Sequence, residues 1–164
     1  MNGTGLQPPR PAVVLGASLA LGLLVAHGLL FGFVIDDAWI SLRYAQNLVD
    51  GHGLVFNPGE PVEGYSNLLW VLLGAMGLVL GLPPIPWLQG LGIAAMGALL
   101  LLVPGAVRRL TGDREMMGPW PGVAAQVLVA ALGPAACWML AGLETPLFGL
   151  LVLAGWRAAM ARRT

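Results

Sequence analysis

The sequence contains no lysine, and only 10% of its 164 residues are charged. Eight arginines balance eight acidic residues, so the formal net charge is zero. Because nucleic-acid binding requires a clustered basic face, this composition argues against a nucleic-acid partner. The one cysteine, Cys137, lies inside an apolar run, which excludes an intrachain disulfide and a CxxC metal or redox motif.

Apolar residues are abundant instead. Hydrophobic residues make up 57% of the chain, and its mean hydropathy is +0.80. This composition is typical of an integral membrane protein, and the length allows about four or five spans at roughly 20 residues each. We therefore predict an all-α, polytopic transmembrane helical bundle. Residues 12–164 form its single membrane domain, after a Gly/Pro-rich, disordered cytoplasmic lead-in over 1–11.

The positions of the arginines decide which of the possible membrane topologies we predict. Five apolar runs are candidate spans: 12–35, 67–82, 87–107, 121–143 and about 146–160. If all five crossed from a cytoplasmic amino terminus, most arginines would be external, against the positive-inside rule. If 67–82 is interfacial or re-entrant, seven arginines are cytoplasmic and Arg43 alone is external. We predict cytoplasmic termini and four spans, at about 12–35, 87–107, 121–141 and 145–161.

This topology makes 36–86 an external loop with two interfacial helices. Ile40, Tyr44 and Leu48 recur at every fourth residue, which predicts a surface helix over 38–50. Gly51 and Gly53 should end that helix, and the Asn57–Glu60 segment contains the Pro-Gly pair of a type II turn. The second helix is predicted over 67–82, with Ser66 as its N-cap.

The strongest functional signal is the acidic pair Asp36-Asp37 at the exit of the first apolar run. Burial of an ionised carboxylate in lipid costs several kcal/mol, so carboxylates at such an exit usually serve chemistry or ion binding. A plainer alternative is that one of the pair caps a helix that starts at Ala38. His27, inside the first span, is a functional candidate by its position, or a packed neutral histidine. The six tryptophans suit interfacial belts.

Two segments carry a resemblance to a known family. The segment 36–70, DDAWISLRYAQNLVDGHGLVFNPGEPVEGYSNLLW, resembles the first external loop of the C-type, polyprenyl-phosphate-sugar-dependent membrane glycosyltransferases. It is most similar to the actinobacterial arabinofuranosyltransferase-like branch. AGLETPLFGLL, at 141–151, resembles the next external acidic motif of that family. The resemblance covers the amino-terminal portion of such an enzyme.

The resemblance implies transfer of a sugar from a lipid-linked sugar phosphate to an acceptor hydroxyl on the external or periplasmic face of the cell membrane. Such a reaction needs a carboxylate to take the acceptor proton and cationic help for the departing phosphate. Asp36 is the candidate general base. Asp37 would orient it, or bind a divalent cation together with Glu144; such a cation is a possible cofactor.

Three further residues are candidates for substrate binding. Arg43 would reach the donor phosphate, and Tyr65 and Asn67 would contact sugar hydroxyls. The expected partners are membrane lipid, a polyprenyl-phosphate sugar and a subunit that supplies the remaining spans. Two alternatives stay open: a non-catalytic membrane module that binds lipid-linked sugar or a partner, and a small ion-binding transporter. Glu144 has an alternative too, as the cap of the last helix ahead of Pro146.

Overall fold

The computed structural model describes residues 11–32, 34–111 and 118–162. The described residues form seven helices and no strand, which confirms the all-α prediction. The helices are α1 (Pro11–Phe31), α2 (Asp36–Val49), α3 (Leu68–Val79), α4 (Pro84–Thr111), α5 (Trp120–Ala131), α6 (Gly133–Leu140) and α7 (Thr145–Ala161). The predicted lead-in lies outside the described residues except for Pro11.

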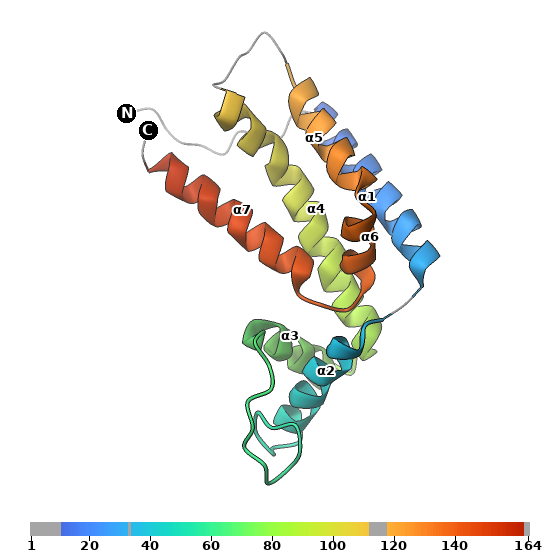
Figure 1. Cartoon of the computed structure of the whole chain (residues 1–164), viewed down its shortest axis with the longest axis vertical. Helices are drawn as coiled ribbons and strands as arrows, with labels where there is room; N and C mark the ends of the chain where they lie inside the picture. Colours follow the sequence, from blue (N-terminus) through green and yellow to red (C-terminus); the bar gives the residue numbers. More distant parts are fainter. Residues whose placement is uncertain (1–10, 33, 112–117, 163–164) are drawn as a thin grey trace.

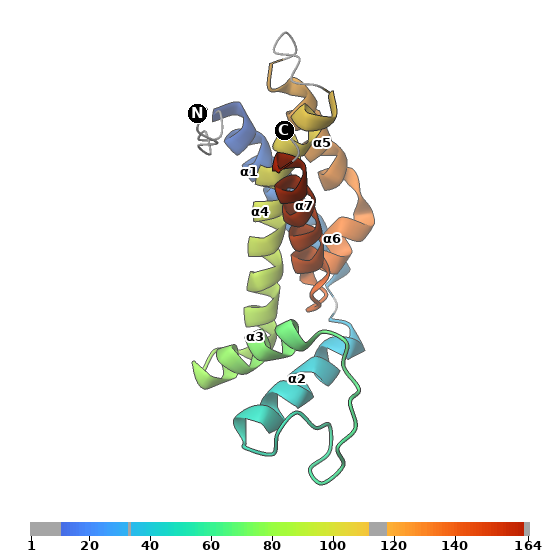
Figure 2. The same cartoon turned by 90° about the vertical axis from the view of Figure 1, so that its left-hand side faces the viewer.

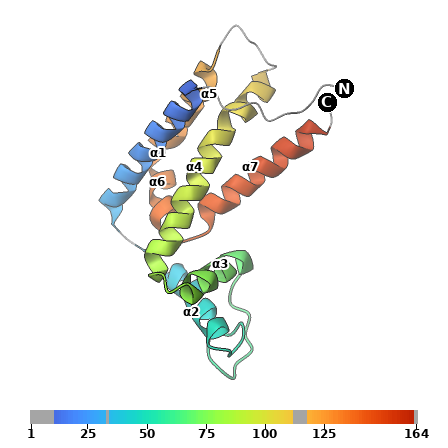
Figure 3. The same ribbon diagram turned by 180° about the vertical axis from the view of Figure 1, so that it is seen from behind.

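Five helices form a bundle, and the other two lie at one end of it (Figure 1). Along the chain, α1, α4, the α5–α6 pair and α7 pass the length of the bundle in alternating directions, as the view from behind also shows (Figure 3). The helices α2 and α3 lie beyond the end where α1 finishes and α7 begins (Figure 2). These four segments correspond to the four predicted spans, and their crossing of a membrane stays a prediction.

Charge is divided between the two ends. Every described acidic residue lies in α2, the 50–67 loop or the turn before α7. Arg108 and Arg109 lie in the last turn of α4, and Arg157 and Arg162 lie toward the end of α7. The described arginines other than Arg43 thus belong to the end of the bundle opposite the acidic residues (Figure 1).

Two helices, α1 and α4, are long and apolar enough to cross a membrane, and α5 with α6 makes a third candidate if the bent pair is counted as one span. The helix α7 is apolar but has only 17 residues. The helix α3 has 12 residues, or about 18 Å of helix, which is too short to cross a hydrocarbon core of about 30 Å. This length agrees with the prediction that 67–82 does not span.

The predicted span over 121–141 is not one continuous helix. It is broken at Leu132, and the axes of α5 and α6 are bent by 68°. Pro134 explains the break, because a proline here has no N–H for the carbonyl of Ala130, and its ring would clash with that carbonyl. Leu132 instead adopts an extended backbone conformation.

Two other span predictions need corrected ends. The first span was predicted to reach residue 35, but α1 ends at Phe31, and Gly32 follows with a φ of +57°. The third apolar run was predicted over 87–107, but α4 covers Pro84–Thr111 and continues through Pro104. The bounds of α7 agree with the prediction of 145–161.

The main core lies where α1, α4, α5 and α6 meet. Leu24, Leu100 and Met139 are buried there among small residues that include Ala17 and Ala136. A second apolar cluster joins α2 to α3 through Tyr44, Ala45 and Val71. A third surrounds Trp70 and connects α3 to the start of α4. The α2–α3 pair therefore has its own packing and is fixed to the bundle.

The helix α2 ends as expected, whereas α3 ends at Val79, three residues before the predicted end, and both helices begin at other residues than predicted. At the end of α2, Gly51 has a φ of +81° and its N–H donates to the carbonyl of Leu48, which closes the helix. Its start is Asp36, two residues earlier than predicted. The N-cap of α3 is Asn67, so the prediction of Ser66 was wrong. The predicted apolar stripe is divided: Tyr44 is buried against α3, but Ile40 is 38% exposed.

Candidate functional site

The acidic pair lies in the first turn of α2, at the end of the bundle where the chain leaves α1. Both side chains are exposed. The N-cap position belongs to Ile35, which has no side chain able to cap, so the alternative that Asp36 or Asp37 is the N-cap was wrong. In the first turn, carboxylates are stabilised by the unpaired N–H groups and the dipole of the helix. The pair is therefore solvent-accessible and favourably placed as anions.

The turn before α7 packs directly beneath this pair. Ile35 donates its N–H to the carbonyl of Ala141 over 3.2 Å. Gly142 has a φ of +88°, and a Cβ added there would lie 3.0 Å from the Cβ of Ala38. The buried indole of Trp70 donates to the carbonyl of Gly142 over 2.9 Å. Contacts from α2 and α3 thus hold this turn at the start of α2.

Asn67 connects Glu144 to the first turns of α2 through hydrogen bonds. The Nδ2 group of Asn67 donates to Oε2 of Glu144 over 2.9 Å and to Oγ of Ser41 over 3.0 Å. The hydroxyl of Ser41 in turn donates to the backbone carbonyl of Asp37 over 3.3 Å. A hydrogen-bonded chain therefore runs from the backbone of the acidic pair to the half-buried carboxylate of Glu144.

This network changes the expectation for two residues. Both amide hydrogens of Asn67 are engaged, so its predicted contact to a sugar could come only through Oδ1. Asn67 also makes no capping hydrogen bond to α3 although it holds the N-cap position. Glu144 is the N-cap residue of α7 by backbone position, yet its side chain makes no capping bond and points to Asn67 instead.

Arg43 lies in the middle of α2, and Tyr65 lies near the end of the loop that returns to α3. Arg43 is exposed, and its Nε donates to the carbonyl of Phe56 over 3.0 Å, which leaves its two terminal NH2 groups outside that bond. Tyr65 packs edge-on against Tyr44, with ring centroids 4.8 Å apart. Arg43 is therefore accessible to an anion, whereas Tyr65 is half-buried and contributes to the apolar cluster between α2 and α3.

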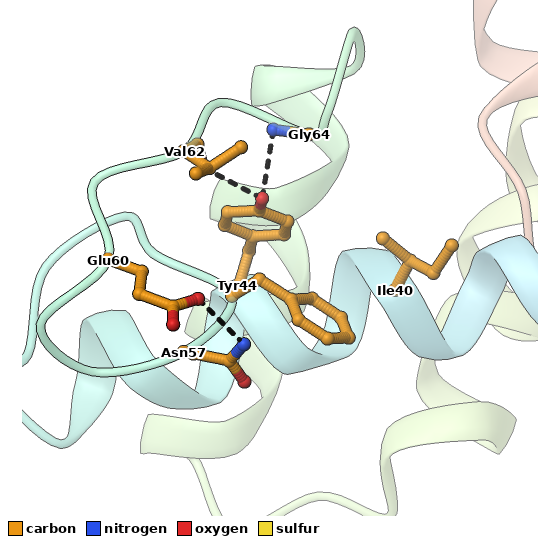
Figure 4. Close-up of a pocket in the computed structure, with 7 residues that line it drawn as sticks. Ile40, Tyr44, Asn57, Glu60, Val62 and Gly64 are labelled. Atoms are coloured by element: carbon orange, nitrogen blue, oxygen red, sulfur yellow. Dashed lines mark hydrogen bonds between the residues drawn. The ribbon is translucent and has the colours of Figure 1, made fainter.

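Side chains of α2 also hold the loop that returns to α3. The hydroxyl of Tyr44 donates to the carbonyl of Val62 over 2.9 Å and accepts from the N–H of Gly64 over 2.8 Å (Figure 4). Asn47 donates to the carbonyls of Val55 and Phe56 over 2.7 and 2.8 Å. The loop is thus fixed by buried groups of α2 rather than being a loose connection.

The acidic turn of this loop has the conformation predicted for it. Gly59 has a φ of +89°, as the third residue of a type II turn requires. The N–H of Glu60 donates to the carbonyl of Asn57 over 3.1 Å. The carboxylate of Glu60 accepts from Nδ2 of Asn57 over 3.1 Å, and Glu63 is exposed.

The predicted cation site at Asp37 and Glu144 remains a prediction. Over residues 11–32, 34–111 and 118–162, no three His, Cys, Asp or Glu side chains gather as ligands for a metal ion. Two carboxylates alone do not supply the six or more oxygen ligands that a divalent cation such as Ca²⁺ takes. Waters and the donor phosphate would have to supply the other ligands of such a cation, and no chemical step below uses one.

Sequence reasoning missed Ser41 and Gly142 and misjudged Trp70. Trp70 was assigned to an interfacial belt, but it is 1% exposed and its N–H is used inside the protein. The available signal for Ser41 was its position four residues after Asp37 on an otherwise apolar face. Gly142 lies within the acidic motif of 141–151, two residues before Glu144, and its positive φ explains why glycine is needed there.

The side chain of His27 packs against its neighbours in α1 and near the start of α6. Its ring lies 5.3 Å from that of Phe31, and it faces the break between α5 and α6, since a Cβ at Gly133 would lie 3.8 Å from its Cε1. These contacts agree with the alternative of a packed histidine.

The fold and the site define an all-helical protein with helices apolar enough to span a membrane and an acidic site at one end of its bundle. No family model matches the chain, and no solved structure matches it significantly. It is 33% identical over 138 residues to the terminal β-(1→2)-arabinofuranosyltransferase of Mycobacterium tuberculosis, which covers 76% of this chain and 21% of that protein. The chain thus spans about a fifth of the relative that it matches. The similarity supports a glycosyltransferase-like character.

Proposed function

We propose that this chain acts in a membrane glycosyltransferase that moves a sugar from a polyprenyl-phosphate donor to an acceptor hydroxyl on the external face of the cell membrane. The observation that carries the proposal is the hydrogen bond between Asn67 and Glu144. It joins the two segments that resemble acidic motifs of one enzyme class, although 77 residues separate them. The similarity to the mycobacterial enzyme supports the same class.

The residues at this end of the bundle can perform such a transfer. The carboxylate of Asp36 takes the proton of the acceptor hydroxyl as its oxygen attacks the anomeric carbon of the donor sugar. The bond from that carbon to the phosphate oxygen breaks, and the electron pair leaves with the polyprenyl phosphate. Arg43 is exposed seven residues later on α2 and stabilises the departing phosphate. Attack from the opposite side inverts the anomeric centre.

The proposed orientation places the acidic end outside. The α1, α4, α5–α6 and α7 segments then cross the membrane four times, and the arginine-rich end of the bundle faces the cytoplasm, as the positive-inside rule requires. At about 1.5 Å per residue, α7 provides about 25 Å, close to a hydrocarbon core of about 30 Å. The carboxylates stay at the membrane surface, where lipid-linked donors present their phosphates.

The chain matches only 21% of its relative, so the proposal gives it part of the reaction rather than the whole. We propose that this chain supplies the general base and the phosphate contact. Membrane lipid and a polyprenyl-phosphate sugar are its expected partners, together with further spans or a partner subunit that completes the groove for the polyprenyl tail. An arabinofuranosyl group is the first donor sugar to test, because the relative's name contains it.

The ion-transport alternative has less support. Gln126 is the buried polar residue that a transport path through the bundle would use, but its Nε2 group donates to the carbonyls of Val13 and Leu100. Its role is therefore to connect helices. The alternative of a non-catalytic module differs from the proposal in one respect, namely whether the carboxylate of Asp36 is needed for turnover.

The test is incorporation of radiolabelled arabinofuranose from a polyprenyl-phosphate donor into acceptor glycan. Membranes that express this chain are compared with an empty vector, an Asp36→Asn variant and a Glu63→Gln variant as a matched control at an exposed carboxylate. We expect transfer that falls at least about 100-fold in Asp36→Asn and is unchanged in Glu63→Gln. Transfer that survives Asp36→Asn contradicts the role of Asp36 as general base. No transfer above the vector from a folded and inserted chain shows that this chain does not act without the further spans or the partner subunit.

A further inference from the structure

An open pocket of about 320 Å³ lies between α2 and the loop that returns to α3. Figure 4 shows Ile40 on the helix at one side of it, with Asn57 and Glu60 on the loop at the other. The pocket is lined by Ile40, Tyr44, Phe56, Asn57, Glu60, Val62 and Gly64. Its volume is at the lower end of the range for small-molecule sites, about 300–1,000 Å³.

The lining is suited to an uncharged, hydroxyl-rich ligand. Phe56 is 39% exposed and presents an aromatic face, against which the apolar C–H groups of a sugar ring can pack. Glu60 provides a carboxylate with one oxygen outside its bond to Asn57, and Asn57 provides an amide oxygen. These groups accept hydrogen bonds from hydroxyls. Among the described lining residues none is basic, and the carboxylate repels a phosphate.

The pocket is held in shape before any ligand arrives. Its floor is Tyr44, whose hydroxyl bonds to both Val62 and Gly64 across the loop. Asn47 is only 3% exposed, and its side-chain amide donates a hydrogen bond to the carbonyl of Phe56, which holds this part of the loop against α2. A preformed site binds more tightly than a mobile loop because less conformational entropy is lost on binding.

The pocket is also close to the acidic pair. Ile40 follows Asp36 by four residues and Asp37 by three, so each carboxylate is a neighbour of Ile40 on the surface of α2, about one turn or about 6 Å away. That distance is about the length of one sugar residue. A sugar in the pocket would therefore place a hydroxyl of its neighbour, or its own, within reach of the proposed base.

We propose that this pocket is a binding subsite for an uncharged glycan, the acceptor of the transfer. The inference rests on the function proposed above and assigns the acceptor to the face of α2 that carries Ile40. The donor phosphate then binds at Arg43, which lies about one turn along α2 from Ile40 and is not among the residues that line the pocket. The acceptor and the donor meet at the acidic pair.

The test is equilibrium binding, which does not depend on turnover. The purified chain in lipid nanodiscs is titrated with an uncharged arabinofuranose tetrasaccharide, with the same tetrasaccharide bearing a terminal phosphate, and with a short polyprenol. Phe56→Ala and Glu60→Gln alter the pocket, and Phe56→Tyr keeps an aromatic ring. Val127→Ala is the matched control, because Val127 is 55% exposed on α5, away from the pocket. Thermal melting shows that each variant is folded.

We expect the uncharged tetrasaccharide to bind, with a Kd at least fivefold weaker in Phe56→Ala and Glu60→Gln and unchanged in Phe56→Tyr and Val127→Ala. Binding that is absent, that is unaffected by both pocket variants, or that favours the phosphate or the polyprenol overturns the subsite. The transfer assay with Asp36→Asn is judged separately. Pocket-dependent binding together with transfer that survives Asp36→Asn therefore refutes the catalytic role of Asp36 alone, and transfer without pocket-dependent binding refutes the subsite alone.

Discussion

Gln126 of α5 donates to the carbonyl of Leu100 in α4 over 3.0 Å, at the position where α4 itself has no donor. In an uninterrupted helix, the N–H of residue 104 would bond to this carbonyl, but Pro104 has no N–H. Gln126 is fully buried and replaces the missing donor from a neighbouring helix. A single amide thus allows a proline inside a 28-residue helix.

This relationship predicts coupling between the two residues. Gln126→Met removes the donor and should lower stability by about 1 kcal/mol, a typical value for a hydrogen bond between helices in a membrane protein. Pro104→Ala restores a backbone N–H at position 104 and keeps the Cβ that contacts Gly122. In that background, Gln126→Met should cost less, because Leu100 has recovered a donor.

A double-mutant cycle in detergent micelles, with apparent melting temperature as the readout, measures the coupling. Val127→Ala, at the next residue of α5 and exposed, is the control. If the effects of Gln126→Met and Pro104→Ala simply add, the amide does not substitute for the missing N–H.

The turn beneath the acidic pair should not tolerate a side chain at position 142. Gly142→Ala forces an alanine to a φ of +88° and brings its Cβ to 3.0 Å from that of Ala38. The backbone strain alone is about 1–3 kcal/mol. Gly81→Ala separates the two causes, because Gly81 has a φ of +69° but open space around its Cβ.

We expect thermal melting of Gly142→Ala to fall further than that of Gly81→Ala. Gly90→Ala, in the open on α4, should be neutral or stabilising by about 0.5–1 kcal/mol. Equal losses at positions 142 and 81 would show that the contact with Ala38 contributes nothing.

The bond between Asn67 and Glu144 should depend on the acceptor more than on the charge. Glu144→Gln keeps an oxygen that can accept from Asn67, so stability should change by less than about 0.5 kcal/mol. Glu144→Ala removes the acceptor and should cost about 1–2 kcal/mol. Asn67→Asp places a second carboxylate against that of Glu144 and should lower stability at least as much as Glu144→Ala does. Added salt screens the repulsion and should reduce this loss.

Melting temperatures at two ionic strengths check all three variants. Ser41→Ala is an informative companion, because it removes the other partner of Asn67 without touching Glu144. A loss in Glu144→Gln as large as that in Glu144→Ala would mean that the negative charge itself holds the turn.

Local signals allowed the sequence to predict much of this fold. Gly51 and Gly59 mark turns through conformations that glycine adopts most easily, and both lie where expected. Thr145-Pro146 marks the start of α7 because proline is favoured in a first helical turn. Gly133-Pro134 is an equally local signal for a break in a helix. The sequence nevertheless predicts one continuous span over 121–141, because that run is uncharged and long enough to cross a membrane.

The site was less predictable because its contacts are long-range. Ser66 and Asn67 are adjacent and both are suitable N-cap residues. Asn67 is the N-cap of α3 in the structure, and its side chain bonds to the carboxylate of Glu144, 77 residues away. The indole of Trp70 likewise finds its partner 72 residues later. Nothing in the spacing of either segment specifies these pairs. The topology predicted from the arginines put both segments on one side of the membrane, and the resemblance of both to one family suggested that they act together.

Arg43 provides the sharpest prediction for the proposed chemistry. If its guanidinium binds the donor phosphate, Arg43→Ala should raise the apparent KM for the donor about 10- to 100-fold, the loss of a hydrogen bond between charged groups worth about 1.5–3 kcal/mol. Arg43→Lys keeps the charge but loses the planar fork, so it should recover part of the affinity. Both variants lose the bond from Nε to the carbonyl of Phe56, so any effect of a loosened loop is common to them. Donor titrations in the transfer assay separate the two roles. Partial recovery in Arg43→Lys indicates phosphate binding, whereas equal defects in both variants, together with an equal fall in melting temperature, show that Arg43 serves only to hold the loop.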